Sequence, residues 1–489
     1  MSQNVVPTAR SRWLALVVLC AGMLMIILDG TIVNVALPAI QDDLGFSQSS
    51  LAWVVNAYLI PFGGLLLLAG RLGDLLGRRG VFLAGLGVFT GASALCGLAQ
   101  SQEVLIGARF LQGAGGALAS AVILGMIVTM FTEPRERATA IGVYSFVASA
   151  GASIGLLAGG VLTQAISWHW IFFVNIPIGI ATAILAVRII GRDRGIGLSR
   201  GADVLGAALV TAGLMIGVYT IVEAAERGWA SGRTLATGAA ALALLASFVV
   251  RQARARTPLM PLRMLRSRNV AGANVVQMLM VAGMFGMFFL GVLYMQRVLG
   301  YDAIETGLAF LPVALLIGAL SLTVSPRLSL RVGGRAVLLA GLVLIVAGLA
   351  IFARVPENAV YAVDILPVMV LLGAGAGLAF PALTSLAMSG ATPEDAGLVS
   401  GLVNTSLQVG GALGLAVLAT LATGRTDALL ADGEGNASAL TGGFAFAFIV
   451  AAALVAAAIV VAATVLRSPA RGPEPAPQAR PSIRSAEGG

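Results

Sequence analysis

Fourteen apolar runs, each about as long as a membrane is thick, recur along this chain of 489 residues. A helix needs about 20 mostly apolar residues to cross a bilayer, so each run predicts one membrane-spanning helix. The sequence therefore predicts an all-α polytopic membrane protein. The runs lie at roughly 13–38, 49–69, 81–99, 103–130, 138–163, 169–190, 203–223, 234–251, 270–296, 304–325, 335–354, 364–389, 396–424 and 443–466.

The charged residues support this class and exclude others. Only 11% of the residues are charged, against about 25% in a typical soluble domain. A net charge of +8 could suggest a nucleic-acid partner, but the arginines lie in short loops between apolar runs rather than on one polar domain. All 30 basic residues are arginine, so the lysine of a Walker A loop is missing. Active transport would therefore use an ion gradient or a separate ATPase.

Arginine placement predicts the orientation. If the N-terminus is cytoplasmic, 24 of the 30 arginines lie in inner segments and five in outer segments, while Arg109 alone falls within a span. Cytoplasmic loops carry the excess of basic residues in membrane proteins. We therefore expect both termini on the cytoplasmic side of the membrane.

A faint internal repeat divides the spans. Gly77-Arg78 follows the second span and Gly334-Arg335 follows the tenth, an offset of 257 residues. Paired halves are typical of secondary transporters. The predicted units are a cytoplasmic N-terminus (1–12), a six-helix bundle (13–190), two additional helices (203–251), a second six-helix bundle (270–466) and a disordered cytoplasmic tail (467–489).

The first run contains an aspartate, Asp29, within the stretch LDGTIVNVALP. A carboxylate in hydrocarbon costs about 3 kcal/mol or more, so it indicates a function. At ~1.5 Å per residue, Asp29 lies ~24 Å along the first helix, and Arg109 lies ~9 Å from the outer start of the fourth. The two would have similar depth, and Gly22 and Ala36 would leave room for a ligand. We expect Asp29 and Arg109 to couple transport to protons; a static structural pair is the alternative.

Three glycine-containing motifs accompany this pair. GRLGDLLGRRG follows the second span and forms a tight cytoplasmic turn. LIGARFLQGAGGA places Arg109 and Gln112 on one helix face. GASIGLLAGG repeats glycine at a spacing that permits close helix approach. The candidate residues of the turn are Gly70, Asp74, Gly77, Arg78 and Arg79, and those of the glycine motif are Gly151, Gly155, Gly159 and Gly160.

Together these motifs resemble the signatures of the major facilitator superfamily. LDGTIVNVALP resembles the first-helix motif of its fourteen-span drug:proton antiporters, the EmrB/QacA-type branch, and the resemblance covers nearly all of residues 13–466. It implies that the Asp74 turn is a latch for switching between inward- and outward-facing states, and that the glycine motif is of the antiporter type. It also implies a bacterial cytoplasmic (inner) membrane as the location. Leu75 and Leu156 stand where the family has a basic residue and a proline.

Other side chains within the spans are candidates for a substrate cavity. Methionine adapts to varied ligands, and amide groups can hydrogen-bond to a substrate or to a neighbouring helix. Packing or contact with lipid is the alternative. The candidates are Asn34, Asn56, Gln112, Gln277, Met284, Tyr294, Asn404 and Gln408.

The leading interpretation is a proton-coupled antiporter that exports lipophilic drugs or antibiotics, acting as a monomer without a cofactor. One alternative is a proton-coupled symporter, or an exporter of a specific metabolite, on the same fold. Others are a membrane enzyme and a receptor that does not transport. One histidine and two cysteines cannot form a metal cluster, which argues against a metal-dependent enzyme.

The orientation can be tested with reporter fusions at Ser468. A cytoplasmic reporter should be active there, because fourteen spans return the chain to the side on which it began. A fusion active only outside the cytoplasm would mean that one span is miscounted, and the short run 234–251 would be the first to re-examine.

Overall fold

The computed structural model describes residues 9–47, 49–191, 193, 195, 197, 202–389 and 396–467. In this part of the chain all regular structure is helical, and thirteen helices are long and apolar enough to cross a membrane. The fourteenth is α5, whose stretch Ile154–Ala165 is apolar. The predicted all-α fold of fourteen spans is thus confirmed. The predicted tail lies outside the described residues from Ser468 onward.

The helices follow the predicted runs closely and extend most of them. The first seven are α1 (Ala9–Leu44), α2 (Ala52–Leu76), α3 (Arg78–Gly97), α4 (Gln102–Met130), α5 (Pro134–Ala165), α6 (Trp170–Phe173) and α7 (Asn175–Ile189). The others are α8 (Val204–Arg227), α9 (Gly232–Arg254), α10 (Arg268–Arg297), α11 (Ala303–Val332), α12 (Gly334–Phe352), α13 (Leu366–Ser389), α14 (Ala396–Ala431) and α15 (Asn436–Thr464). One predicted run, 169–190, contains both α6 and α7.

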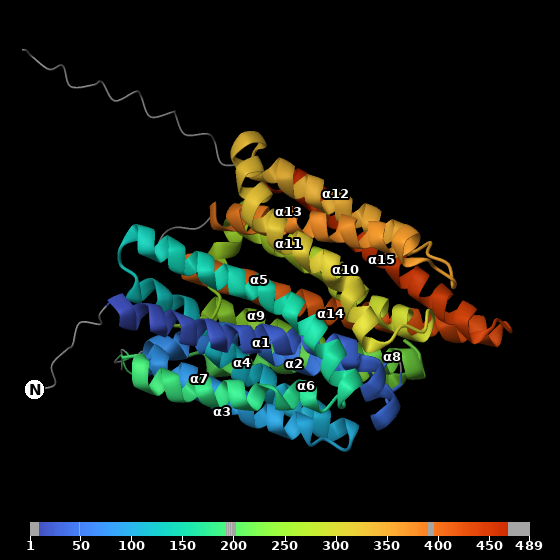
Figure 1. Cartoon of the computed structure of the whole chain (residues 1–489), viewed down its shortest axis with the longest axis horizontal. Coiled ribbons are helices and arrows are strands. Elements are labelled where there is room, and N and C mark those ends of the chain that lie inside the picture. Colours follow the sequence, from blue (N-terminus) through green and yellow to red (C-terminus); the bar gives the residue numbers. More distant parts are fainter. Residues whose placement is uncertain are drawn as a thin grey trace, which may run out of the picture.

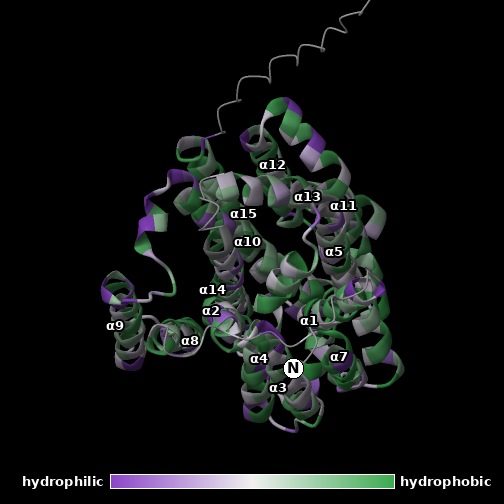
Figure 2. Ribbon diagram, turned by 90° about the vertical axis from the view of Figure 1, so that its left-hand side faces the viewer, coloured by the Kyte–Doolittle hydropathy of each residue, from purple (hydrophilic) through white to green (hydrophobic). Residues whose placement is uncertain are grey.

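The helices pack as two groups with a hairpin at one flank (Figures 1 and 2). Helices α1 to α7 pack on one another, and α10 to α15 form the second group. The groups meet where α2 packs on α14 and α5 packs on α11. Helix α8 lies against α2 and α14, and α9 packs on α8 at the edge of the molecule (Figure 2).

Two turns with the same backbone shape relate the groups. Gly77 ends α2 and begins α3 with φ 100°, and Gly333 ends α11 and begins α12 with φ 91°. Positive φ is open mainly to glycine, which explains this residue at both turns. The glycine that corresponds to Gly77 is therefore Gly333, one residue before the predicted Gly334.

Most polar contacts between the two groups lie at one end of the bundle, here called the Asp302 end because that residue caps the start of α11. Arg297 of α10 donates to the carbonyl oxygen of Pro38 at 3.2 Å and forms an ion pair with Asp42, both on α1. Gln164 of α5 donates to Asp302 at 3.0 Å. The Glu305 backbone N–H and this amide hold the pKa of Asp302 below its usual value, so it accepts both bonds as a carboxylate.

The glycine motif of α5 lies between α1 and α11. A methyl group on Gly159 would lie 2.6 Å from a carbonyl oxygen of α1, and one on Gly160 would lie 2.6 Å from a carbonyl oxygen of α11. Gly151 and Gly155 also face α1. Glycine at these positions therefore lets the α5 backbone approach a helix of each group.

Replacement of Gly159 by valine should destabilise the protein, because overpacking costs about 1–3 kcal/mol. The measurement is the thermal unfolding midpoint of the purified protein in detergent. The matched control is Gly87→Val in α3, where an added methyl group would meet nothing within 4 Å. Equal midpoints for the two variants would contradict close packing at Gly159.

Candidate functional site

Asp29 and Arg109, which are 80 residues apart in sequence, form an ion pair with no solvent exposure. Arg109 Nη1 lies 2.6 Å from Asp29 Oδ2, and both side chains are 0% exposed. Arg109 also donates from Nε to the carbonyl oxygen of Val54 at 2.9 Å. Its guanidinium group lies over the Tyr58 ring, 4.4 Å from the centroid. Helices α1, α2 and α4 therefore meet at this pair.

The second oxygen of Asp29 accepts two amide donors. Gln112 Nε2 lies 2.7 Å from Asp29 Oδ1, and Asn175 Nδ2 lies 2.9 Å from the same atom. Ser93 of α3 accepts from both amides, at 2.6 and 3.3 Å. Gln112 Oε1 in turn accepts from Arg109 Nη1 at 2.7 Å. We call Asp29, Ser93, Arg109, Gln112 and Asn175 the Asp29 network.

Every member of the Asp29 network is 0% exposed. An unpaired charge in such a place is costly, whereas a paired and hydrogen-bonded charge can be tolerated. The expected room for a ligand beside Asp29 is absent in this structure. Gly22 lies against the Phe82 ring, 3.0 Å from where its methyl group would be, and Ala36 is fully buried. Any ligand or proton would thus need a rearrangement to reach Asp29.

Sequence reasoning identified only part of this network. It paired Asp29 with Arg109 by depth, but it assigned Gln112 to the substrate cavity, and the structure places Gln112 on Asp29 instead. Asn175 and Ser93 were missed. Asn175 is the first residue of α7, directly after the break at Val174 that separates α6 from α7. A lone asparagine in the run FFVNIPIG was the available signal.

The turn around Asp74 lies at the opposite end of the bundle from Asp302. Arg78 Nη2 lies 3.2 Å from Asp74 Oδ1, and its Nη1 donates to the carbonyl oxygen of Gly125 in α4 at 3.1 Å. Arg79 donates to Val187 of α7 at 2.6 Å. These hydrogen bonds hold the ends of α2, α3, α4 and α7 together.

Two further residues shape this turn. Asp193 accepts the backbone N–H groups of Arg78 and Arg79 at 2.6 and 3.1 Å, which satisfies the start of α3. Leu75, which replaces the basic residue of the family motif, is 2% exposed. Gly70 has open space around it, and Gly77 provides the positive φ described above. The basic side chain that pairs with Asp74 in this turn is that of Arg78.

The sequence matches the Major Facilitator Superfamily over residues 19–415. The chain belongs to this superfamily. A puromycin resistance protein of Streptomyces alboniger is 39% identical to it over 444 residues, covering 90% of this chain and 88% of that protein. A cephamycin export protein of Amycolatopsis lactamdurans is 40% identical over 429 residues, covering 86% and 88%. The chain is thus a transporter of the major facilitator superfamily rather than an enzyme.

Solved structures of major facilitator transporters share its fold. A bacterial homologue of the human lysosomal transporter Spinster, inward-facing and unoccupied, has a TM-score of 0.65 with 16% identity, covering 95% of this chain and all of that one. The POT family transporter PepTSo has a TM-score of 0.66 with 15% identity, covering 93% and 98%. At such identities the likeness concerns the fold alone.

The remaining candidates for the substrate cavity of this major facilitator transporter differ in whether their polar atoms have hydrogen-bond partners. Asn56 is fully buried in α2, and neither its Nδ2 nor its Oδ1 has a partner among the described residues. Buried Oε1 atoms of Gln277 and Gln408 also lack one there. Asn34 and Asn404 donate to carbonyl oxygens one turn earlier in their own helices, those of Gly30 and Ser400. Tyr294 of α10 donates to the carbonyl oxygen of Pro356, in the segment that follows α12. Met284 is 3% exposed and packed in the core.

The ion pair can be tested with Arg109→Lys, which keeps the positive charge. Lysine lacks the planar fork that reaches Val54, Asp29 and Gln112 together. Hydrogen bonds to charged groups contribute about 1.5–3 kcal/mol, so the thermal midpoint in detergent should fall clearly. The matched control is Arg188→Lys at the exposed end of α7, which should leave the midpoint unchanged. A normal midpoint for Arg109→Lys would contradict the role of the fork.

Proposed function

We propose that this chain is a proton-coupled antiporter that exports lipophilic drugs or antibiotics across the bacterial cytoplasmic membrane. The observation that carries the proposal is the enclosed Asp29–Arg109 pair. Placing a carboxylate within a membrane span costs free energy, so such a residue indicates a functional site. Arg109 stays charged, so the proton is carried by Asp29. The names of the two relatives, which refer to resistance and export, support export of a small molecule.

Helix α1 would link proton binding to the opening of the transporter. This helix carries Asp29. One to four turns after Asp29, its residues accept hydrogen bonds from Gln296 and Arg297 of α10. Loss of these contacts would free the Asp302 end of α1. Movement of α1 would then separate Asp29 from Arg109 and open a path for a proton. Burial favours the neutral acid and a nearby cation favours the carboxylate, so the two arrangements would differ in their affinity for the proton.

The contacts of the Asp302 end support an inward-facing state. We infer that this end is extracytoplasmic and that the Asp74 end is cytoplasmic, with both termini inside, as the arginine distribution predicts. The proposed units are the bundles 13–190 and 270–466, with 203–251 as an added hairpin. The Asp74 turn would act as the latch, because its contacts tie four helix ends within one bundle. We propose a monomer, since each chain holds both bundles.

The substrate cavity is proposed to lie between the bundles, along α2, α10 and α14. Unpaired amide atoms on Asn56, Gln277 and Gln408 support this place, because buried polar atoms normally find a partner. Gln408 lies against Gly63 of α2 across the seam between the bundles. A lipophilic substrate with one or two hydrogen-bonding groups would suit such a cavity, and a cationic one could compete for Asp29.

A second candidate is an exporter of one specific metabolite. It is favoured by the names of the two relatives, each of which refers to a single antibiotic. A susceptibility panel in a pump-deficient host separates the two, because a drug exporter raises resistance to several unrelated compounds and a specific exporter to one.

Proton coupling can be tested in inverted membrane vesicles that have been acidified inside. Addition of a substrate such as puromycin should release protons from vesicles with the wild-type protein. Asp29→Asn should abolish this release, because the amide cannot carry the proton. Asp29→Glu should retain part of it with a shifted pH optimum.

Two controls make the result interpretable. Asp432→Asn changes an exposed carboxylate and should behave as wild type. The amount of Asp29→Asn protein in the membrane must equal that of the wild type, and the protein must elute as a single species in detergent. Wild-type proton release from such an Asp29→Asn protein would contradict the proposal.

A further inference from the structure

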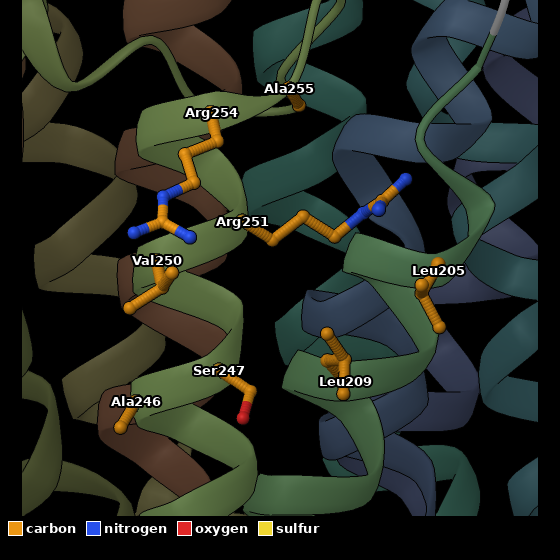
Figure 3. A pocket seen from close by; sticks show the side chains of 8 residues that line it. All are labelled: Leu205, Leu209, Ala246, Ser247, Val250, Arg251, Arg254 and Ala255. Atoms are coloured by element: carbon orange, nitrogen blue, oxygen red, sulfur yellow. The ribbon is translucent and has the colours of Figure 1, made fainter.

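The hairpin of α8 and α9 contains a groove that the Asp29 network does not use. Leu205 and Leu209 of α8 form one wall and Val250 of α9 forms part of the other, with Arg251 and Arg254 at the Asp74 end (Figure 3). Its volume is about 510 Å³, which is within the range of about 300–1,000 Å³ typical of small-molecule sites. The groove is apolar along its length and positive at one end.

The groove faces the surroundings of the bundle rather than its interior. Helix α9 packs on α8 at the edge of the molecule (Figure 2). Only 11% of its most apolar stretch is buried, and Leu242, Val249 and Val250 are exposed. A large exposed apolar face on a membrane-spanning helix meets lipid, so lipid has direct access to the groove.

One of the two arginines is held in place by a buried carboxylate. Arg251 Nε lies 2.5 Å from Asp203 Oδ1, and Asp203 also accepts from Gln252 and from the backbone N–H of Gly206. Burial acts to raise the pKa of Asp203, but these hydrogen bonds, with that from Arg251 first, hold it below its usual value. Asp203 is therefore a carboxylate that orients Arg251, whose side chain reaches from α9 across to the start of α8 (Figure 3).

Arg254 contributes a further positive charge at this end of the groove. Arg254 is exposed and has no carboxylate or hydrogen-bond partner among the described residues. The sequence has no acidic residue between Arg227 and Tyr301, and four more arginines follow within the linker to α10 and its start. An anion beside Arg251 and Arg254 would thus meet attraction from several charges.

We propose that this groove is a binding site for an anionic phospholipid of the adjacent leaflet. The phosphate would lie at the Asp74 end of the groove, between Arg254 and Arg251, and one acyl chain would lie along Leu205, Leu209 and Val250. Basic pockets at the ends of membrane helices bind anionic headgroups in this way. The site would hold the added hairpin in the bilayer, and it does not depend on the proposed transport activity.

The test uses the full chain in lipid nanodiscs that contain a small fraction of phosphatidylglycerol with a photoreactive acyl chain. Nanodiscs present both leaflets equally, so the result does not depend on the orientation. Labelling is mapped by mass spectrometry to the peptides of α8 and α9. Unlabelled phosphatidylglycerol should reduce this labelling, whereas phosphatidylcholine at the same concentration should not.

Two variants change the site in different ways. Arg254→Gln removes a headgroup contact, and labelling should need about five-fold more lipid, since one basic residue at an anionic surface contributes that much. Ser247→Phe fills the groove from the exposed face of α9 and should remove labelling while both arginines stay. The control, Arg327→Gln, changes another exposed arginine at the Asp74 end, on α11, and should leave labelling unchanged.

Several results would overturn the proposal. Unchanged labelling of α8 and α9 in both Arg254→Gln and Ser247→Phe would exclude the groove as the site. An equal loss with Arg327→Gln would mean that the lipid follows overall charge only. Competition by glycerol 3-phosphate as strong as that by phosphatidylglycerol would mean that the site binds a free anion rather than a lipid.

Discussion

The ion pair between Asp29 and Arg109 is the interaction on which the rest of this structure depends. Each side chain stabilises the other in the bundle, because a buried charge without its partner costs several times what a typical hydrogen bond contributes. The pair therefore requires α1 and α4 to lie side by side at one depth. Gln112, Asn175 and Ser93 complete the hydrogen bonding of the carboxylate and bring α3 and α7 to the same point.

The same helix that carries Asp29 also makes the main polar contacts with the other bundle. Along α1, the glycine face of α5 packs closely on one side, and Gln296 and Arg297 of α10 bind near its end. A change in the contacts of Asp29, or in the contacts of α1 with α10, would be transmitted through the rigid helix α1. This arrangement gives a physical reason for coupling a proton site to the opening of one end of the transporter, without a separate moving part.

Much of the fold could be read from the sequence, because the membrane makes each span a long apolar run. The pair Asp29–Arg109 was also accessible, since charges within such runs are few and the helix rise gives their depth. Asn175 and Ser93 were not, because neutral polar residues are common in spans and only packing decides which of them reach the carboxylate. The one-residue shift of the turn from Gly334 to Gly333 depends on backbone geometry that no residue pattern specified. The contact of Arg297 with Asp42 depends on how the two bundles meet.

The most direct test of this account measures protons released when the purified protein binds a cationic substrate in a weakly buffered detergent solution. No gradient or membrane is involved, so the result reports on the binding site itself. The account predicts that, at a pH at which Asp29 is protonated, the wild-type protein releases protons on binding and that Asp29→Asn binds the substrate with little or no release. Equal release from both proteins, at equal occupancy by the substrate, would show that the proton is carried elsewhere and would contradict the account.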